Sequence, residues 1–74
     1  MAKTYKTGRR REFATGQRKR DLRDTIAVLE ADRRAHQRQL AGETETRFSE
    51  AWLRQRIAEL TTSLEGHRRT LATL

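Results

Sequence analysis

The sequence predicts an all-α fold, an antiparallel two-helix hairpin of coiled-coil type preceded by a basic, flexible N-terminal arm. Apolar residues recur in two stripes with the a/d spacing of packed helices. A short connection that contains glycine separates the two stripes. The net charge of +7 comes entirely from the start of the chain, and 74 residues suffice for one small domain.

The first helix is expected over residues 17–41. Its stripe repeats at alternating intervals of four and three residues, which keeps one side of the helix turned towards a partner. The members of this stripe are Leu22, Ile26, Leu29, Arg33, His36 and Leu40. Arg33 is interpreted as a residue whose stem packs while its charged head reaches water. A polar position that sets the register of the two helices is the alternative.

The second helix is expected over residues 46–73, after a turn at 42–45. Its stripe consists of Leu53, Ile57, Leu60, Leu64, His67, Leu71 and Leu74. Gly42 suits the left-handed position that follows a helix end, and Thr44 or Thr46 is the expected cap of the next helix. Because the connection is short, the helices are expected to be antiparallel neighbours, and the numbers of facing residues should sum to about 89.

Apolar and small residues beside the two stripes predict a further contact surface. The expected partner or dimer interface consists of Val28, Ala31, Ala35, Phe48 and Trp52. A chain of this length buries a modest core, so association is a common source of additional stability. We therefore expect two hairpins to form a four-helix bundle as a homodimer, or a helix of a partner protein to take the same place.

Residues 1–16 are predicted to form a basic arm that is disordered or orders on binding. Residues 1–20 contain eight Lys or Arg and one Glu, whereas residues 21–74 contain nine Arg and nine acidic residues. The eight basic residues, which are the expected nucleic-acid-binding site, are Lys3, Lys6, Arg9, Arg10, Arg11, Arg18, Lys19 and Arg20. Tyr5 and Phe13 are the only aromatic residues in residues 1–20, so contacts mainly to phosphates and little base specificity are expected.

The sequence does not predict an enzyme, a metal site or a cofactor. There is no Cys, and no Ser–His or paired-carboxylate arrangement is brought together by the expected register. His36 and His67 lie far apart in that register and are interpreted as tolerated polar residues on the seam. No small-molecule substrate is expected. The chain shows neither a secretory signal nor a membrane-spanning segment, so a soluble, cytoplasmic protein is expected.

These features predict a small nucleic-acid-binding accessory or regulatory protein, with DNA and RNA both open as ligands. The alternative is a protein-interaction module, such as a bacterial or phage modulator, an assembly factor or a subunit of a ribonucleoprotein. In that case the arm binds an acidic partner and the hairpin is the docking surface. A third interpretation is binding to an anionic membrane surface, for which Phe13 alone provides little insertion.

Overall fold

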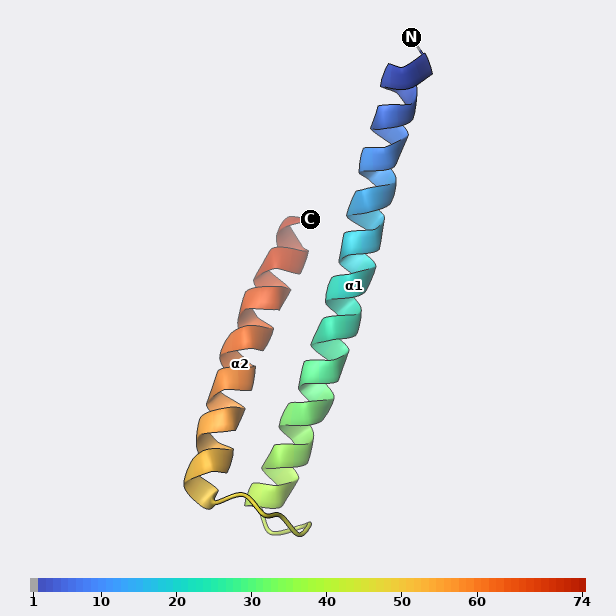
Figure 1. The fold of residues 1–74 in the computed structure, drawn as a ribbon. Coiled ribbons are helices and arrows are strands. Elements are labelled where there is room, and N and C mark those ends of the chain that lie inside the picture. The colour runs from blue at the N-terminus through green and yellow to red at the C-terminus, as the bar shows by residue number, and fades with distance from the viewer. Residues whose placement is uncertain (1) are drawn as a thin grey trace.

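The computed structural model describes the backbone of residues 2–74 and the side chains of residues 15–74. Helices α1 (Ala2–Leu40) and α2 (Glu50–Thr73) are antiparallel and pack side by side, which confirms the predicted hairpin (Figure 1). No strand occurs within residues 2–74. The molecule is elongated, measuring 62 × 18 × 15 Å.

One seam between the two helices contains the core. Four apolar side chains are buried there, namely Ile26, Leu53, Leu60 and Leu64. All the remaining residues of the two predicted stripes are buried or half-buried, so the a/d pattern identified the packed side of each helix correctly. Near the connection, His36 faces Trp52 and Asp32 faces Arg56, and the residue numbers of each pair sum to 88, close to the predicted 89. Farther along, the long Arg33 and Arg68 side chains reach Thr61 and Glu30, and those pairs sum to 94 and 98.

The end of α1 is fixed by Gly42, as predicted. Gly42 has a φ of +79°, a left-handed conformation in which a side chain would be strained. The Gly42 amide donates to the Gln39 carbonyl at 3.1 Å, and the Glu43 amide donates to the Arg38 carbonyl at 3.0 Å. These two bonds form a Schellman motif, which satisfies the last carbonyls of the helix and reverses the chain.

The start of α2 differs from the prediction. Helix α2 begins at Glu50 instead of residue 46, and its cap is Ser49, not Thr44 or Thr46. The Ser49 hydroxyl accepts the Trp52 amide at 3.1 Å, as an N-cap does. The Thr46 hydroxyl instead accepts the Phe48 amide at 3.1 Å, which holds a local turn before the helix. The connection therefore spans residues 41–49, longer than the predicted turn.

The predicted basic arm over residues 1–16 falls almost entirely on residues whose side chains lie outside the described part of the chain. Helix α1 begins at Ala2, so it includes residues 2–16, and it extends past the end of α2 (Figure 1). The prediction that this arm is disordered, or orders on binding, stays a prediction. Met1 lies outside the described residues.

Candidate nucleic-acid and partner interfaces

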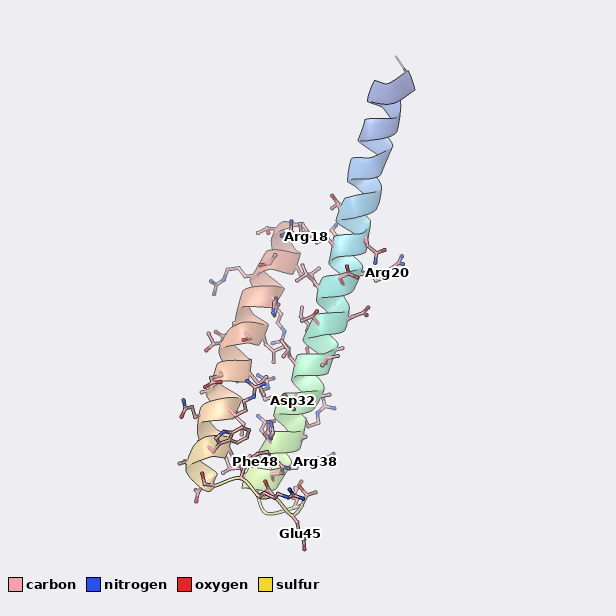
Figure 2. The ribbon with its side chains drawn as sticks, viewed as in Figure 1. Arg18, Arg20, Asp32, Arg38, Glu45 and Phe48 are labelled. Carbon is pink, nitrogen blue, oxygen red and sulfur yellow. The ribbon has the colours of Figure 1, made fainter. Side chains whose placement is uncertain are left out.

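Three of the predicted nucleic-acid-binding residues have described side chains, and they lie where α1 passes the end of α2. Arg18 and Arg20 are exposed and Lys19 is half-buried. Figure 2 shows Arg18 on the side of α1 that faces α2 and Arg20 on the opposite side. Among the described side chains, none of the three forms an ion pair. Their charges are thus available to an external anion.

Four arginines of the hairpin body are in a different situation. Arg54 and Arg68 form short ion pairs, with Glu50 at 2.6 Å and with Glu30 at 2.7 Å. Arg56 lies between two carboxylates and Arg38 lies 4.0 Å from Glu43. Four of the nine arginines of residues 21–74 thus lie in ion pairs, and this part of the chain is neutral in net charge. Arg18, Lys19 and Arg20, by contrast, form no ion pair among the described side chains.

Five further predicted site residues lie in the part of α1 whose side chains are not described. They are Lys3, Lys6, Arg9, Arg10 and Arg11. Their backbone is helical and continuous with the helix that carries Arg18 to Arg20. All eight basic residues thus belong to one helix, and the phosphate contacts of all eight stay a prediction.

An aromatic cluster lies at the other end of the hairpin, beside the connection. The Phe48 and Trp52 rings stack with centroids 4.0 Å apart and planes 17° apart. The His36 ring meets both edge-on, with centroids 6.0 Å from Phe48 and 5.4 Å from Trp52. Phe48 and Trp52 nevertheless keep 44% and 41% of their surface exposed. This half-exposed pair is the part of the predicted interface that the fold brings together.

The other three residues of that predicted interface do not join the cluster. Val28 is 67% exposed, and Ala31 and Ala35 are also exposed. At about 100° per residue, all three lie roughly 140–200° around α1 from Ile26, which is buried in the seam. They therefore form a separate stripe on the outer side of α1, and their place in a partner interface stays a prediction.

Asp32 is a site residue that the sequence interpretation missed. Its carboxylate lies 3.5 Å from His36 Nε2 and 3.7 Å from Arg56 Nη2. His36 Nδ1 lies 2.9 Å from Gln39 Oε1, so both ring nitrogens of this buried histidine have polar neighbours. The signal was present in the sequence, because Asp32 precedes His36 by four residues, the spacing of neighbours on one helix face.

The aromatic cluster borders a surface depression that runs between the two helices. The residues lining it are Asp32, His36, Phe48, Trp52, Gln55, Arg56 and Glu59. Its lining combines aromatic rings with acidic and basic groups. Aromatic residues and arginine are enriched in protein contact surfaces.

Neither a candidate metal site nor a membrane-spanning helix occurs among the described residues. No group of three or more His, Cys, Asp or Glu side chains that could hold a metal ion occurs among them. No helix in this part of the chain is both long enough and apolar enough to cross a membrane. Comparison of the chain with protein-family models, with curated proteins and with solved structures gave no match.

Proposed function

We propose that this protein binds nucleic acid in the cytoplasm through the basic N-terminal part of α1, by contacts mainly to phosphates. The proposed role is binding without catalysis and without a cofactor. One observation carries it: the whole net charge of +7 lies in residues 1–20 at the N-terminal end of α1, while residues 21–74 are neutral in net charge. Sequence-independent phosphate contact is what such a charge distribution favours.

The polarity of the helix supports the same proposal. The N-terminal end of a helix carries a partial positive charge, and α1 has no acidic residue in its first turn. Lys3 lies in this first turn, where the repulsion between a basic side chain and the helix dipole costs a few tenths of a kcal/mol. A bound phosphate removes this repulsion, so the segment is more stable on a polyanion than alone.

An electrophoretic mobility shift assay at 50 and 200 mM salt tests the proposal. If six to eight charges engage duplex DNA, the slope of log affinity against log salt is expected to be roughly −5 to −7. Replacing Arg9, Arg10 and Arg11 together by Gln should make the slope shallower by about 3, since each lost phosphate contact removes roughly one unit.

The matched control removes the same charge from the hairpin body, by replacing the exposed residues Arg34, Arg47 and Arg69 with Gln. This variant should keep most of the affinity and the slope. Equal losses of affinity in the two variants would show that net charge alone determines binding, and would overturn the assigned site. Absence of any shift at 50 mM salt would reject nucleic acid in favour of an acidic protein partner for the same segment.

We further propose that the hairpin pairs with a second copy to form a four-helix bundle, with Phe48 and Trp52 at the contact. The support is the small core of four buried apolar side chains, beside two stacked rings that stay almost half exposed. Two helices alone rarely supply enough buried apolar area for an independent domain, and closed C2 dimers are the commonest solution.

Sedimentation of two single variants tests the dimer. Trp52→Ser should shift the protein towards the monomer, whereas Val28→Ser, on the separate outer stripe, should not. A monomeric wild-type protein at micromolar concentration would reject the dimer. If Val28→Ser dissociates the dimer and Trp52→Ser does not, the dimer contact lies on the outer stripe instead. A helix from another protein on the same surface would appear as a wild-type monomer that becomes a complex only when that partner is added.

A further inference from the structure

The exposed rings and the basic residues of this protein lie at opposite ends of the hairpin. Among the described side chains three large apolar ones are exposed, and two of them, Phe48 and Trp52, form the stacked pair beside the connection. The third, Val28, belongs to the outer stripe of α1. Figure 2 shows Phe48 at the connection end, and Arg18 and Arg20 near the other end, where α2 finishes. A contact made by the two rings therefore leaves the basic end free.

The surface of α2 next to the two rings is polar. The depression beside Trp52 shares Gln55 and Glu59 with another depression farther from the connection. Apart from Ala58, the residues lining this other depression are polar, namely Gln55, Glu59, Thr62 and Ser63. A second copy that covered the full length of this surface would desolvate these polar groups, which is costly unless each finds a partner. Contact limited to the connection end covers the rings and leaves these side chains in water.

Phe48 gives the connection end a shape that suits contact with an identical copy. Its ring lines the depression beside Trp52 and also one formed by residues of the connection, so it stands between the two. In a C2 dimer the same patch occurs on both copies, and the ring of each copy can enter a depression of the other. Acidic and basic side chains line both depressions, so acid can face base across the dimer axis. They are Glu45 and Arg47 in one depression, and Asp32, Arg56 and Glu59 in the other.

The distribution of charge favours the same arrangement. Residues 21–74 have no net charge, so two connection ends approach without net repulsion, whereas residues 1–20 carry +7 in each copy. Arg18 lies 18 residues before His36, which faces Trp52, and this is about 27 Å along α1 at 1.5 Å per residue. Pairing at the connection ends thus separates the Arg18 residues of the two copies by about 50 Å, far more than the Debye length of about 8 Å.

We infer that two copies pair connection to connection, and that the dimer binds a separate nucleic-acid segment at each basic end and so bridges the two segments. The inference rests on the proposed function, which supplies nucleic acid as the ligand and a second copy as the partner. A parallel pair of hairpins would instead place both basic ends together on one segment. The body between the two ends is neutral in net charge, so it adds no attraction for a single duplex lying along the dimer.

Distances between spin labels test how the two copies are arranged. The chain has no Cys, so Ala72→Cys or Thr44→Cys, both at exposed positions, introduces one label per copy. Ala72 lies 20 residues after Trp52, so pulsed electron resonance should place the two Ala72 labels about 60 Å apart and the two Thr44 labels within about 30 Å. Similar distances for the two label pairs would show that the copies overlap along their full length, and would overturn the inference.

A capture experiment tests the bridging itself. An immobilised DNA duplex of about 12 base pairs should retain a second, fluorescent duplex of the same length when the wild-type protein is added at 50 mM salt. Each duplex is about 40 Å long, too short to reach both basic ends of one dimer. Trp52→Ser should still bind the immobilised duplex but capture about tenfold less of the second one, because capture needs two linked sites. Val28→Ser is the matched control and should capture as the wild type does.

The outcomes separate the bridging from the proposed function. Binding of the wild-type protein without capture of the second duplex would overturn bridging and leave nucleic-acid binding intact. Equal capture by Trp52→Ser and the wild type, with circular dichroism showing both to be helical, would also overturn it. Failure of the wild-type protein to bind the immobilised duplex at all would reject the proposed function itself.

Discussion

The His36 imidazole meets the Trp52 indole edge-on, with ring centroids 5.4 Å apart and planes at 83°. The contact joins α1 to α2 close to the connection between them. It is continued by the stack of Trp52 on Phe48, so three rings close this end of the hairpin. The opposite end has no such cluster among the described side chains, and there α1 continues alone.

Removal of the Trp52 ring should destabilise the hairpin measurably. Trp52→Ala loses the stack on Phe48 and the edge contact with His36, and we expect the free energy of unfolding to fall by about 1–3 kcal/mol. The loss stays below that of a buried core residue because 41% of the Trp52 surface is exposed. Urea unfolding followed by far-UV circular dichroism at one fixed protein concentration measures it.

Val28→Ala is the control for this measurement, because Val28 is 67% exposed on the outer side of α1. Its effect on the free energy of unfolding should stay within about 0.5 kcal/mol. Comparable losses from Trp52→Ala and Val28→Ala would show that the aromatic cluster does not stabilise the hairpin.

The packed seam could be predicted from the sequence because a/d spacing depends only on helix geometry. Gly42 was equally predictable, since few residues other than glycine adopt its left-handed conformation. The start of α2 was not, because Thr44, Thr46 and Ser49 are all cap-forming residues within one connection. Local hydrogen bonds determine which of them is the cap. The Thr46 hydroxyl accepts the Phe48 amide, and the Ser49 hydroxyl accepts the Trp52 amide and caps α2.

The candidate interface was predicted in part, for a related reason. Phe48 and Trp52 were recognised as surface rings, but their stacking depends on the path of the connection, which helix periodicity does not describe. Val28 was assigned to the same surface although it lies on the outer side of α1. The pair of Asp32 with His36 follows a four-residue spacing and was predictable from the sequence.

The cap assignment at α2 leads to a paired prediction. Ser49→Ala removes the acceptor of the Trp52 amide and should lower the free energy of unfolding by about 0.5–2 kcal/mol. Thr44→Ala changes an exposed residue of the connection for which the structure shows no capping bond, and its effect should stay within about 0.5 kcal/mol. Chemical denaturation compares the two variants. A larger loss of stability from Thr44→Ala would show that Thr44, not Ser49, caps α2.

Two glycines should respond to alanine in opposite directions. Gly66 lies inside α2, and a methyl group added there meets no atom within 4 Å. Gly66→Ala should therefore raise the free energy of unfolding by about 0.5–1 kcal/mol through helix propensity. Gly42→Ala should lower it by about 1–2 kcal/mol, since its φ of +79° strains a side chain even though the space is open. Thermal melts measure both, and a destabilising Gly66→Ala would contradict the helical role of this position.

Arg33 is the polar residue in the middle of the seam, and its replacement tests what it does there. Its Nη1 donates to Thr61 Oγ1 at 3.3 Å, while the Thr61 hydroxyl donates to the Ile57 carbonyl at 2.9 Å. Removing the guanidinium leaves the Thr61 donor satisfied, so no buried polar group loses its only partner. Arg33→Leu also adds apolar area to the seam, and we expect stability to rise by about 1 kcal/mol.

Arg34→Leu is the matched control, because Arg34 is the exposed neighbour and its replacement should change stability by less than about 0.5 kcal/mol. The two interpretations of Arg33 then separate by experiment. If Arg33 only packs its stem, Arg33→Leu gains stability and keeps a sharp, cooperative melt. If Arg33 sets the register, the same variant melts over a broader range, because an apolar seam without its polar position accepts shifted pairings of α1 and α2.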